Sequence, residues 1–283
     1  MTDTSPGAAS PLAGGATTQR RPAAWGRWLA HFLVAPSGVL LFLAVWTVLA
    51  FELPPSRLVS PYAVAVDLWN NFLRSPRLEV FGLGRTGYGT LLLYTTRNVL
   101  IGLVVGSAVG IVIGIASARL RPLRLIVDPI VLVLGTVPVL VAAPLFLLWF
   151  GVVPFTQVLL VGGYSAVMMV IFAQRAAANV DPVYEKSAMA RGASWRDRLF
   201  LVLIPGTLPE ILGGLRITLA SAWGLETFAE ILGAPSGIGQ AIKTLTNVNN
   251  VAGMLACVSL VALTAIIMDM LLVALARWVT RWA

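Results

Sequence analysis

The chain has 283 residues, of which 58% are hydrophobic and only 11% are charged, whereas a soluble domain is usually about 45–50% apolar and about 25% charged. This composition predicts a chain that is solvated mostly by lipid and excludes an ordinary soluble domain. The formal net charge of +8 does not indicate nucleic-acid binding, because the basic residues cluster at the ends of apolar runs, where such residues set membrane topology.

The residues that usually carry enzyme chemistry are scarce. The chain has one cysteine, Cys257, and one histidine, His31, far apart in the sequence. They provide neither a cluster of zinc ligands nor a Cys–His nucleophile pair. We therefore predict no catalytic residue and no metal site, and an intramembrane enzyme is the least favoured function.

The amino-terminal segment differs from the rest of the chain. Residues 1–27 are rich in Gly, Ala, Pro, Ser and Thr and contain no apolar run to bury. Such a composition favours disorder. We predict a disordered cytoplasmic tail followed by a transmembrane domain over residues 28–281.

Six stretches approach the length of about 20 mostly apolar residues that a bilayer-spanning helix needs. They are residues 28–51, residues 97–119, a stretch ending near Phe150, a stretch starting near Phe155, residues 209–232 and residues 251–279. The third contains Pro138 and Pro144, so we expect a kink or an unwound turn there. The predicted fold class is all-α, a polytopic membrane protein with about six transmembrane helices.

The second predicted span carries glycines at every fourth position, Gly102, Gly106, Gly110 and Gly114. This spacing places them on one face of a helix and permits close helix–helix approach. The face predicts either tight packing inside one bundle or an interface between subunits.

The distribution of basic residues predicts the orientation of the spans. Of the 20 lysines and arginines, 13 lie in segments on the same side as the amino terminus, 5 lie on the opposite side, and Arg97 and Arg216 lie within spans. The positive-inside rule therefore predicts that both termini and the segment 181–205 are cytoplasmic.

The first outer segment, residues 52–85, contains a helix-start signal at Ser60-Pro61. Val64, Leu68 and Phe72 follow at a spacing of four. This pattern predicts a short amphipathic helix that either lies on the outer membrane interface or packs on the bundle.

Residues 181–205, DPVYEKSAMARGASWRDRLFLVLIP, form a polar interruption between apolar segments. Pro182 suits a helix start, Gly192 is expected to break the helix, and Ser194 can cap a second helix with Asp197 at its third position. Two prolines are expected to end this second helix before the fifth span, Pro205 and Pro209. The segment predicts two short helices with a glycine corner that contact a cytosolic partner. The alternative is an ordinary loop whose charges only set topology.

This loop resembles the "EAA" signature of ABC importer permeases, which is Glu-Ala-Ala, three residues, Gly, nine residues, then Ile-x-Leu-Pro. Gly192 and the sequence Val202-Leu203-Ile204-Pro205 match its glycine, spacing and terminal proline, and Ala188 matches its second alanine. Lys186 and Ser187 occupy the positions of the signature's Glu and first Ala, and the acid stands one place earlier, at Glu185.

The wider resemblance runs from about residue 53 to residue 281 and is closest to permeases of nitrate/sulfonate/taurine importers. It includes LPPSRLVSPYAVAVDLW, LRPLRLIVDPIVLVLGTVPVLVAAPLFLLWFGV and PGTLPEILGGLRITLASAWGLETFAEILGAPSGIG. The resemblance implies a type I ABC importer permease fold, with a permease domain over 28–281, its core over 88–280 and a coupling-helix loop at 181–205.

The resemblance also implies partners and a site. The coupling loop would dock on a separate cytoplasmic ATPase dimer, which would bind ATP and Mg, because no G-x-x-x-x-G-K-[ST] loop occurs in this chain. A second permease copy and a periplasmic or lipid-anchored substrate-binding protein would complete the importer in a bacterial inner membrane, for a small anion such as sulfonate, taurine or nitrate. The implied coupling residues are Glu185, Lys186, Ser187, Ala188, Ala190, Arg191, Gly192, Ala193, Ser194 and Arg196.

Ionisable residues inside spans are functional candidates, because they are costly there. Glu226 and Glu230 share a helix face, and they would line the translocation path or gate together with Pro138 and Pro144, or tether the outer gate loop. They could also form the ion site of the alternative function, an ion-coupled secondary transporter.

The remaining intramembrane charges predict ion pairs. We expect Asp128 and Asp269 to pair with nearby Arg124 or Arg277. Arg216 is expected to pair with Glu210 or with another helix, and Arg97 to reach the outer interface from the start of its span.

Overall fold

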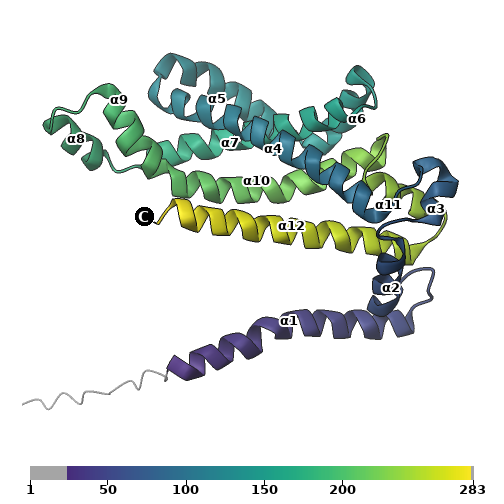
Figure 1. The fold of residues 1–283 in the computed structure, drawn as a ribbon. Helices are drawn as coiled ribbons and strands as arrows, with labels where there is room; N and C mark the ends of the chain where they lie inside the picture. The colour runs from purple at the N-terminus through teal and green to yellow at the C-terminus, as the bar shows by residue number, and fades with distance from the viewer. Residues whose placement is uncertain (1–23, 282–283) are drawn as a thin grey trace, which may run out of the picture. The chain divides into compact units, whose positions relative to one another are not determined.

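The computed structural model describes residues 24–281, with side chains from residue 37 to residue 281, and every regular element in that range is a helix (Figure 1). Four of these helices are long and apolar enough to cross a membrane, and a bent helix pair raises the number to five. The predicted all-α class is confirmed. The predicted disordered tail lies outside the described residues except for its last four, which begin α1 (Ala24–Glu52).

Most of α1 belongs to a compact unit of its own, which ends at Leu49. Its apolar part runs from Ser37 to Glu52, within the first predicted span. The second unit starts at Ala50 and contains all the elements described below.

The glycine face of α4 (Tyr88–Arg119) packs against α7 (Pro154–Asn179). A Cβ at Gly106 would collide with the backbone of Gly162, and one at Gly110 would collide with the carbonyl oxygen of Ala166. The two backbones are therefore as close as glycine allows, and the interpretation as packing inside one bundle is confirmed. The sequence predicted that Arg97 stands at the start of its span. α4 begins at Tyr88, so Arg97 lies inside the helix.

The third predicted span is broken into α5 (Arg121–Thr136) and α6 (Val139–Phe150), which meet at an angle of 97°. The break lies at Pro138, the N-cap residue of α6, whose fixed φ and missing N–H suit a helix start. Pro144 lies inside α6. The predicted interruption is confirmed at Pro138.

The polar segment 181–205 contains α8 (Pro182–Ala190), α9 (Trp195–Asp197) and a π-helical turn, η2 (Arg198–Leu203), which leads directly into α10 (Ile204–Leu232). The prediction that Pro205 and Pro209 end a helix was wrong. Pro205 lies just after the π-helical turn η2, where the chain passes into α10 without a break. Pro209 lies inside α10, which packs along α7 and continues to Leu232.

The outer segments pack on the ends of the long helices. α2 (Pro61–Asn71) contacts α12 (Val251–Val279), its N-cap Ser60 accepts a hydrogen bond from the amide of Ala63, and Asp67 accepts one from the hydroxyl of Tyr88 at 2.8 Å. The predicted helix is therefore confirmed, and it packs on the bundle. α11 (Ile238–Asn247) contacts α10, α12 and α4.

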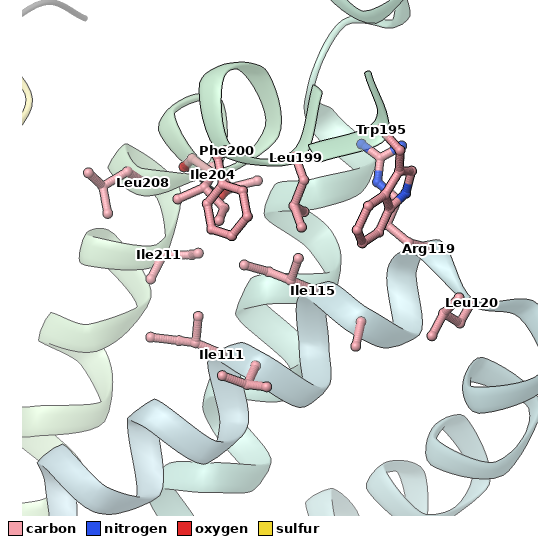
Figure 2. Close-up of a pocket in the computed structure, with 13 residues that line it drawn as sticks. Ile111, Ile115, Arg119, Leu120, Trp195, Leu199, Phe200, Ile204, Leu208 and Ile211 are labelled. Carbon is pink, nitrogen blue, oxygen red and sulfur yellow. Dashed lines mark hydrogen bonds between the residues drawn. The ribbon is translucent and has the colours of Figure 1, made fainter. Parts of the chain in front are cut away.

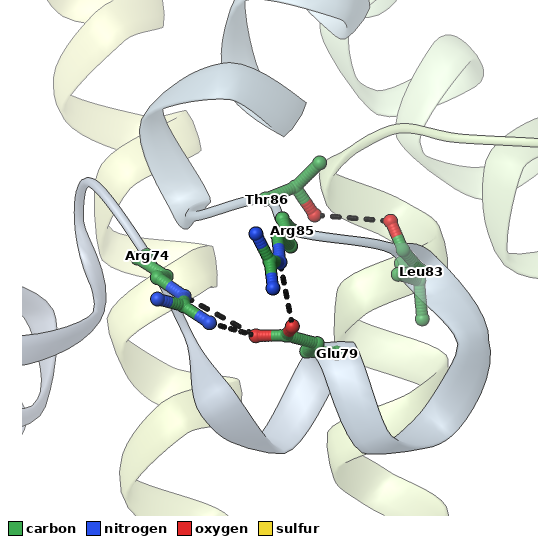
Figure 3. A network of polar contacts seen from close by, with 5 residues as sticks. All are labelled: Arg74, Glu79, Leu83, Arg85 and Thr86. Carbon is green, nitrogen blue, oxygen red and sulfur yellow. Dashed lines mark hydrogen bonds and ion pairs between the residues drawn. The ribbon is translucent and has the colours of Figure 1, made fainter.

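The segment before α4 contains α3 (Pro76–Leu78) and a π-helical turn, η1 (Glu79–Leu83), and an ion-pair network on Glu79 of η1 joins the residues on either side of them (Figure 3). Glu79 accepts hydrogen bonds from Arg74 at 2.7 and 3.2 Å and from Arg85 at 3.3 Å. The Arg74 bond, with a smaller contribution from Arg85, lowers the pKa of Glu79 below its ordinary value. The network is therefore present at neutral pH and is lost as the pH falls through the lowered pKa.

A matched pair of glycine variants tests the α4–α7 contact. Gly106→Ala places a Cβ against the Gly162 backbone, and such overpacking costs about 1–3 kcal/mol. Gly163→Ala, on α7, meets no atom within 4 Å and adds a better helix former. We expect a lower melting temperature in detergent for the first variant only. Equal melting temperatures would contradict the close contact.

Candidate coupling and gate sites

The glycine corner of the polar loop is built by backbone geometry. Asp181 caps α8 by accepting the amide of Val183 at 2.8 Å. At the other end, the amide of Gly192 bonds to the carbonyl of Met189 at 2.9 Å and that of Ala193 to Ala188 at 3.0 Å. Gly192 has a φ of +80°, the left-handed conformation that ends many helices and that glycine adopts without a steric penalty.

The second half of the loop starts with the predicted capping box. Ser194 and Asp197 exchange hydrogen bonds, with the Ser194 amide donating to the Asp197 carboxylate at 2.9 Å and the Asp197 amide donating to the Ser194 hydroxyl at 3.3 Å. These bonds satisfy backbone donors at the start of α9. The corner between α8 and α9 therefore has hydrogen-bonded structure on both sides.

An ion pair attaches the loop to the bundle. Glu185 on α8 pairs with Arg119, the last residue of α4, with N–O distances of 2.5 and 3.0 Å. Both side chains are partly buried, at 22% and 32% exposed. The acid that stands one place before the signature's glutamate thus joins the loop to α4. Arg119 could not be found from the sequence, because it lies 66 residues away.

Most of the predicted coupling residues are exposed. Glu185, Ala188 and Ala193 are partly buried. The others are exposed, namely Lys186, Ser187, Ala190, Arg191, Gly192, Ser194 and Arg196. Three large apolar side chains beside them, Tyr184, Met189 and Trp195, are also exposed. The loop thus presents a mixed polar and apolar surface.

An apolar pocket of about 600 Å³ lies where this loop meets the long helices (Figure 2). Ile111 and Ile115 of α4, Leu199 and Phe200 of η2, and Ile211 of α10 line it. Trp195 and Arg119 lie together at one side of the pocket (Figure 2). An apolar cavity lined by the long helices and by the second half of the loop therefore lies beside the Glu185–Arg119 attachment.

The second predicted group, Glu226 and Glu230, is fully buried within the subunit. Glu230 accepts hydrogen bonds from the hydroxyl of Thr95 and the amide of Gly239, both at 2.8 Å. The Thr95 hydroxyl also accepts the amide of Ile238 at 3.0 Å. A carboxyl group from α10 and a hydroxyl group from α4 therefore cap the first turn of α11.

Glu226 belongs to a second set of contacts among α4, α7 and α10. Asn98 donates to Glu226 at 2.9 Å and to Gln157 at 3.1 Å, and Tyr94 donates to Gln157 at 3.2 Å. Sequence reasoning missed these partners, because single Asn, Gln and Tyr residues in apolar helices carry no spacing signal.

The two prolines predicted for the path lie elsewhere. Pro138 lines an apolar cavity of about 480 Å³ among α5, α6 and α7, and Pro144 is exposed on α6. The structure brings the two glutamates together but not the prolines with them.

The intramembrane ion pairs agree only in part with the sequence. Asp128 pairs with Arg124 at 3.2 Å, as predicted. Asp269 pairs with Arg216, and not with Arg277, because α10 and α12 lie side by side and bring the two groups within 2.8 Å. The expectation that Arg216 pairs with another helix is confirmed. Glu210 instead accepts hydrogen bonds from Asn179.

The fold is that of a known class of membrane transporters. The chain superposes on the MetNI methionine ABC transporter in its inward-facing conformation with a TM-score of 0.54 and 19% identity, over 68% of this chain and 94% of that one. The two folds share the arrangement of type I ABC importer permeases, so the predicted architecture is confirmed.

The sequence matches define the family. The profile of the binding-protein-dependent transport system inner membrane component matches residues 110–281, more than half of the chain. The taurine transport system permease protein TauC of Escherichia coli is 35% identical over 61% of this chain, and the alignment spans 63% of that relative. The nitrate import permease protein NrtB of Synechococcus elongatus is 31% identical over 71% of this chain and 72% of its own length.

The chain therefore belongs to the binding-protein-dependent inner membrane transport components, and it is a multi-pass membrane protein. The recognised resemblance to nitrate, sulfonate and taurine permeases is confirmed. The members of this family are transport components, which confirms the prediction that the chain is a permease subunit and not an enzyme. The comparisons give no support to the ion-coupled secondary transporter.

Removing the Glu230 carboxyl group tests its contact with α11. In Glu230→Ala, the buried amide of Gly239 loses its acceptor, while the Thr95 hydroxyl keeps the Leu91 carbonyl. The loss costs about 1–3 kcal/mol and corresponds to about 5- to 150-fold faster amide exchange in residues 238–247. Thr244→Ala is the control, because the Thr244 hydroxyl donates to the carbonyl of Gln240 within the same helix. Unchanged exchange in Glu230→Ala would show that the cap does not hold α11.

Proposed function

We propose that this chain is the permease subunit of an ATP-driven importer and that it forms the translocation path for a small anion. The permease domain comprises residues 28–281, with its core over 88–280. Both termini and the loop 181–205 face the cytoplasm, as the distribution of basic residues favours. A second copy of the chain completes the path, and a substrate-binding protein delivers the solute from the outer side.

The observation that carries this proposal is the construction of the loop. It exposes seven of the ten coupling residues, yet it is joined to α4 by the Glu185–Arg119 ion pair and to α10 through η2. A surface that is exposed on one side and attached to two long helices on the other can transmit the movement of a bound partner. We assign that partner as a cytoplasmic ATPase dimer, which binds ATP and Mg.

The relatives support the substrate class. TauC is a taurine permease and NrtB is a nitrate permease, and both solutes carry an oxyanion group. We propose the same class for this chain, and we expect the binding protein to choose among its members.

The buried carboxyl groups fit an outer gate in this scheme. Glu230 holds α11 on the ends of α10 and α4, so movement of α10 during the cycle would move α11 with it. We propose that Glu226 and Glu230 act through this attachment, and that Pro138 is the hinge of the broken span.

Exchanging the charges of the ion pair tests the coupling role. Arg119→Ala breaks the attachment of α8, so we expect ATP-dependent uptake of taurine or nitrate into proteoliposomes, with the partner ATPase and binding protein present, to fall about 5- to 150-fold. ATP hydrolysis is expected to continue. The double variant Arg119→Glu/Glu185→Arg restores an ion pair of opposite polarity and is expected to recover uptake. Equal uptake by the wild type, Arg119→Ala and the double variant would refute the coupling role of the ion pair. Uptake by the wild-type chain without any ATPase would refute the importer function.

The glycine corner gives a second test. A Cβ at Gly192 meets no atom within 4 Å, so only the backbone conformation opposes substitution, at about 1–2 kcal/mol for most residues. Asparagine tolerates this conformation and a β-branched residue does not. We expect Gly192→Asn to retain uptake and Gly192→Val to lose most of it, with both variants inserted in the membrane. Equal uptake would mean that the corner's conformation is not needed.

A further inference from the structure

An ion pair lies on the surface of the second unit. Nε and Nη2 of Arg216 on α10 donate to the two carboxylate oxygens of Asp269 on α12 at 2.8 and 2.7 Å. The side chains are 46% and 37% exposed, whereas Glu226 and Glu230 on the same α10 are fully buried. The pair is thus held in a fixed two-bond geometry and is open on one side.

The position of the pair along its helices places it at the depth of the hydrocarbon. At 1.5 Å per residue, Arg216 lies about 18 Å from the start of α10 and about 24 Å from its end, and Asp269 lies about 15 Å from the end of α12. The hydrocarbon layer is about 30 Å thick. Charged groups at this depth face a bundle interior or a water-filled cavity, because exposure to lipid is costly.

The exposed face of α10 around Arg216 carries small residues and one large side chain, Ile217. The small residues are Gly213, one turn before Arg216, and Ala220 and Gly224, one and two turns after it, all exposed. A Cβ at Gly213 or Gly224 would meet no atom within 4 Å. The residues one turn before and one turn after Arg216 therefore leave space beside its guanidinium, and a small solute could approach it closely.

We propose that Arg216 lies in the aqueous path and binds the oxyanion group of the transported solute, while Asp269 positions the guanidinium. This assignment rests on the proposed importer function and adds a contact for the solute. The two bonds to Asp269 use Nε and Nη2, and Nη1 carries two further N–H donors that suit a planar or tetrahedral oxyanion. Asp269 neutralises the arginine, so the anion is bound weakly enough to leave.

The first experiment measures access to water. Cys257 is the only cysteine and is buried, so a Cys257→Ala chain is a suitable background for single cysteines at Gly213, Ala220 and Gly224. Ile267→Cys and Leu271→Cys are the controls, because these exposed residues of α12 lie two positions from Asp269 and so about 160° around the helix from it.

In the assembled transporter, a membrane-impermeant charged methanethiosulfonate should label the three α10 cysteines and not the two controls. The solute that the wild-type chain transports, taurine or nitrate, should slow the labelling of Ala220→Cys. Labelling of the controls alone, or of none of the five cysteines, would overturn the proposal.

The second experiment separates anion binding from a purely structural ion pair. Arg216→Asp/Asp269→Arg keeps an ion pair between the two helices but moves the guanidinium to α12. We expect this variant to assemble and melt like the wild type and to lose uptake. Arg216→Lys keeps the charge without the planar fork and is expected to reduce the maximal uptake rate.

Recovery of uptake in the exchanged pair would show that the ion pair only joins α10 to α12 and would overturn the proposal. Wild-type uptake in the same vesicles is the reference. If the wild-type chain fails to transport with ATP and its partners, the importer function itself is refuted. If it transports and the exchanged chain transports equally, only the role of Arg216 is refuted.

Discussion

The close approach of α4 and α7 supports the other parts of the bundle. Because the glycines of α4 face the backbone of α7, side chains larger than a hydrogen atom would push the two helices apart at Gly106 and Gly110. α4 carries partners for both ends of the molecule, since Thr95 and Asn98 meet the buried glutamates and Arg119 meets the polar loop. A change in the distance between α4 and α7 would therefore alter the contacts of α4 both at the buried glutamates and at the polar loop.

α10 provides the second connection between these sites. It begins directly after η2 at the polar loop and ends at the carboxyl groups that hold α11. Its length of 29 residues corresponds to about 44 Å, which exceeds the hydrocarbon thickness of about 30 Å. A rigid helix of this length can carry displacement across the membrane without a chain of separate contacts.

The polar groups of the bundle fall into two kinds. Glu226 and Glu230 are enclosed by Asn98, Thr95 and the amide of Gly239, whereas Arg216 and Asp269 share an ion pair that is open on one side. Both carboxylate oxygens of Glu230 have partners and hold one geometry, whereas Oε2 of Glu226 has no hydrogen-bond partner among the described residues. An open charged group at membrane depth needs water or a solute. The difference in burial, and not the residue type, separates the enclosed glutamates from the open ion pair.

The sequence by itself determined the fold class, the glycine face of α4, the break at Pro138, the capping box at Ser194 and the corner at Gly192. These features depend on spacing of a few residues or on one residue's backbone preference, which are local properties. Only the tertiary structure decided that Arg119 is the partner of Glu185, that Asp269 pairs with Arg216, and that α10 continues through Pro209. These results depend on which helices lie side by side, and the two ion pairs join residues 66 and 53 positions apart, which meet only after the whole bundle has packed.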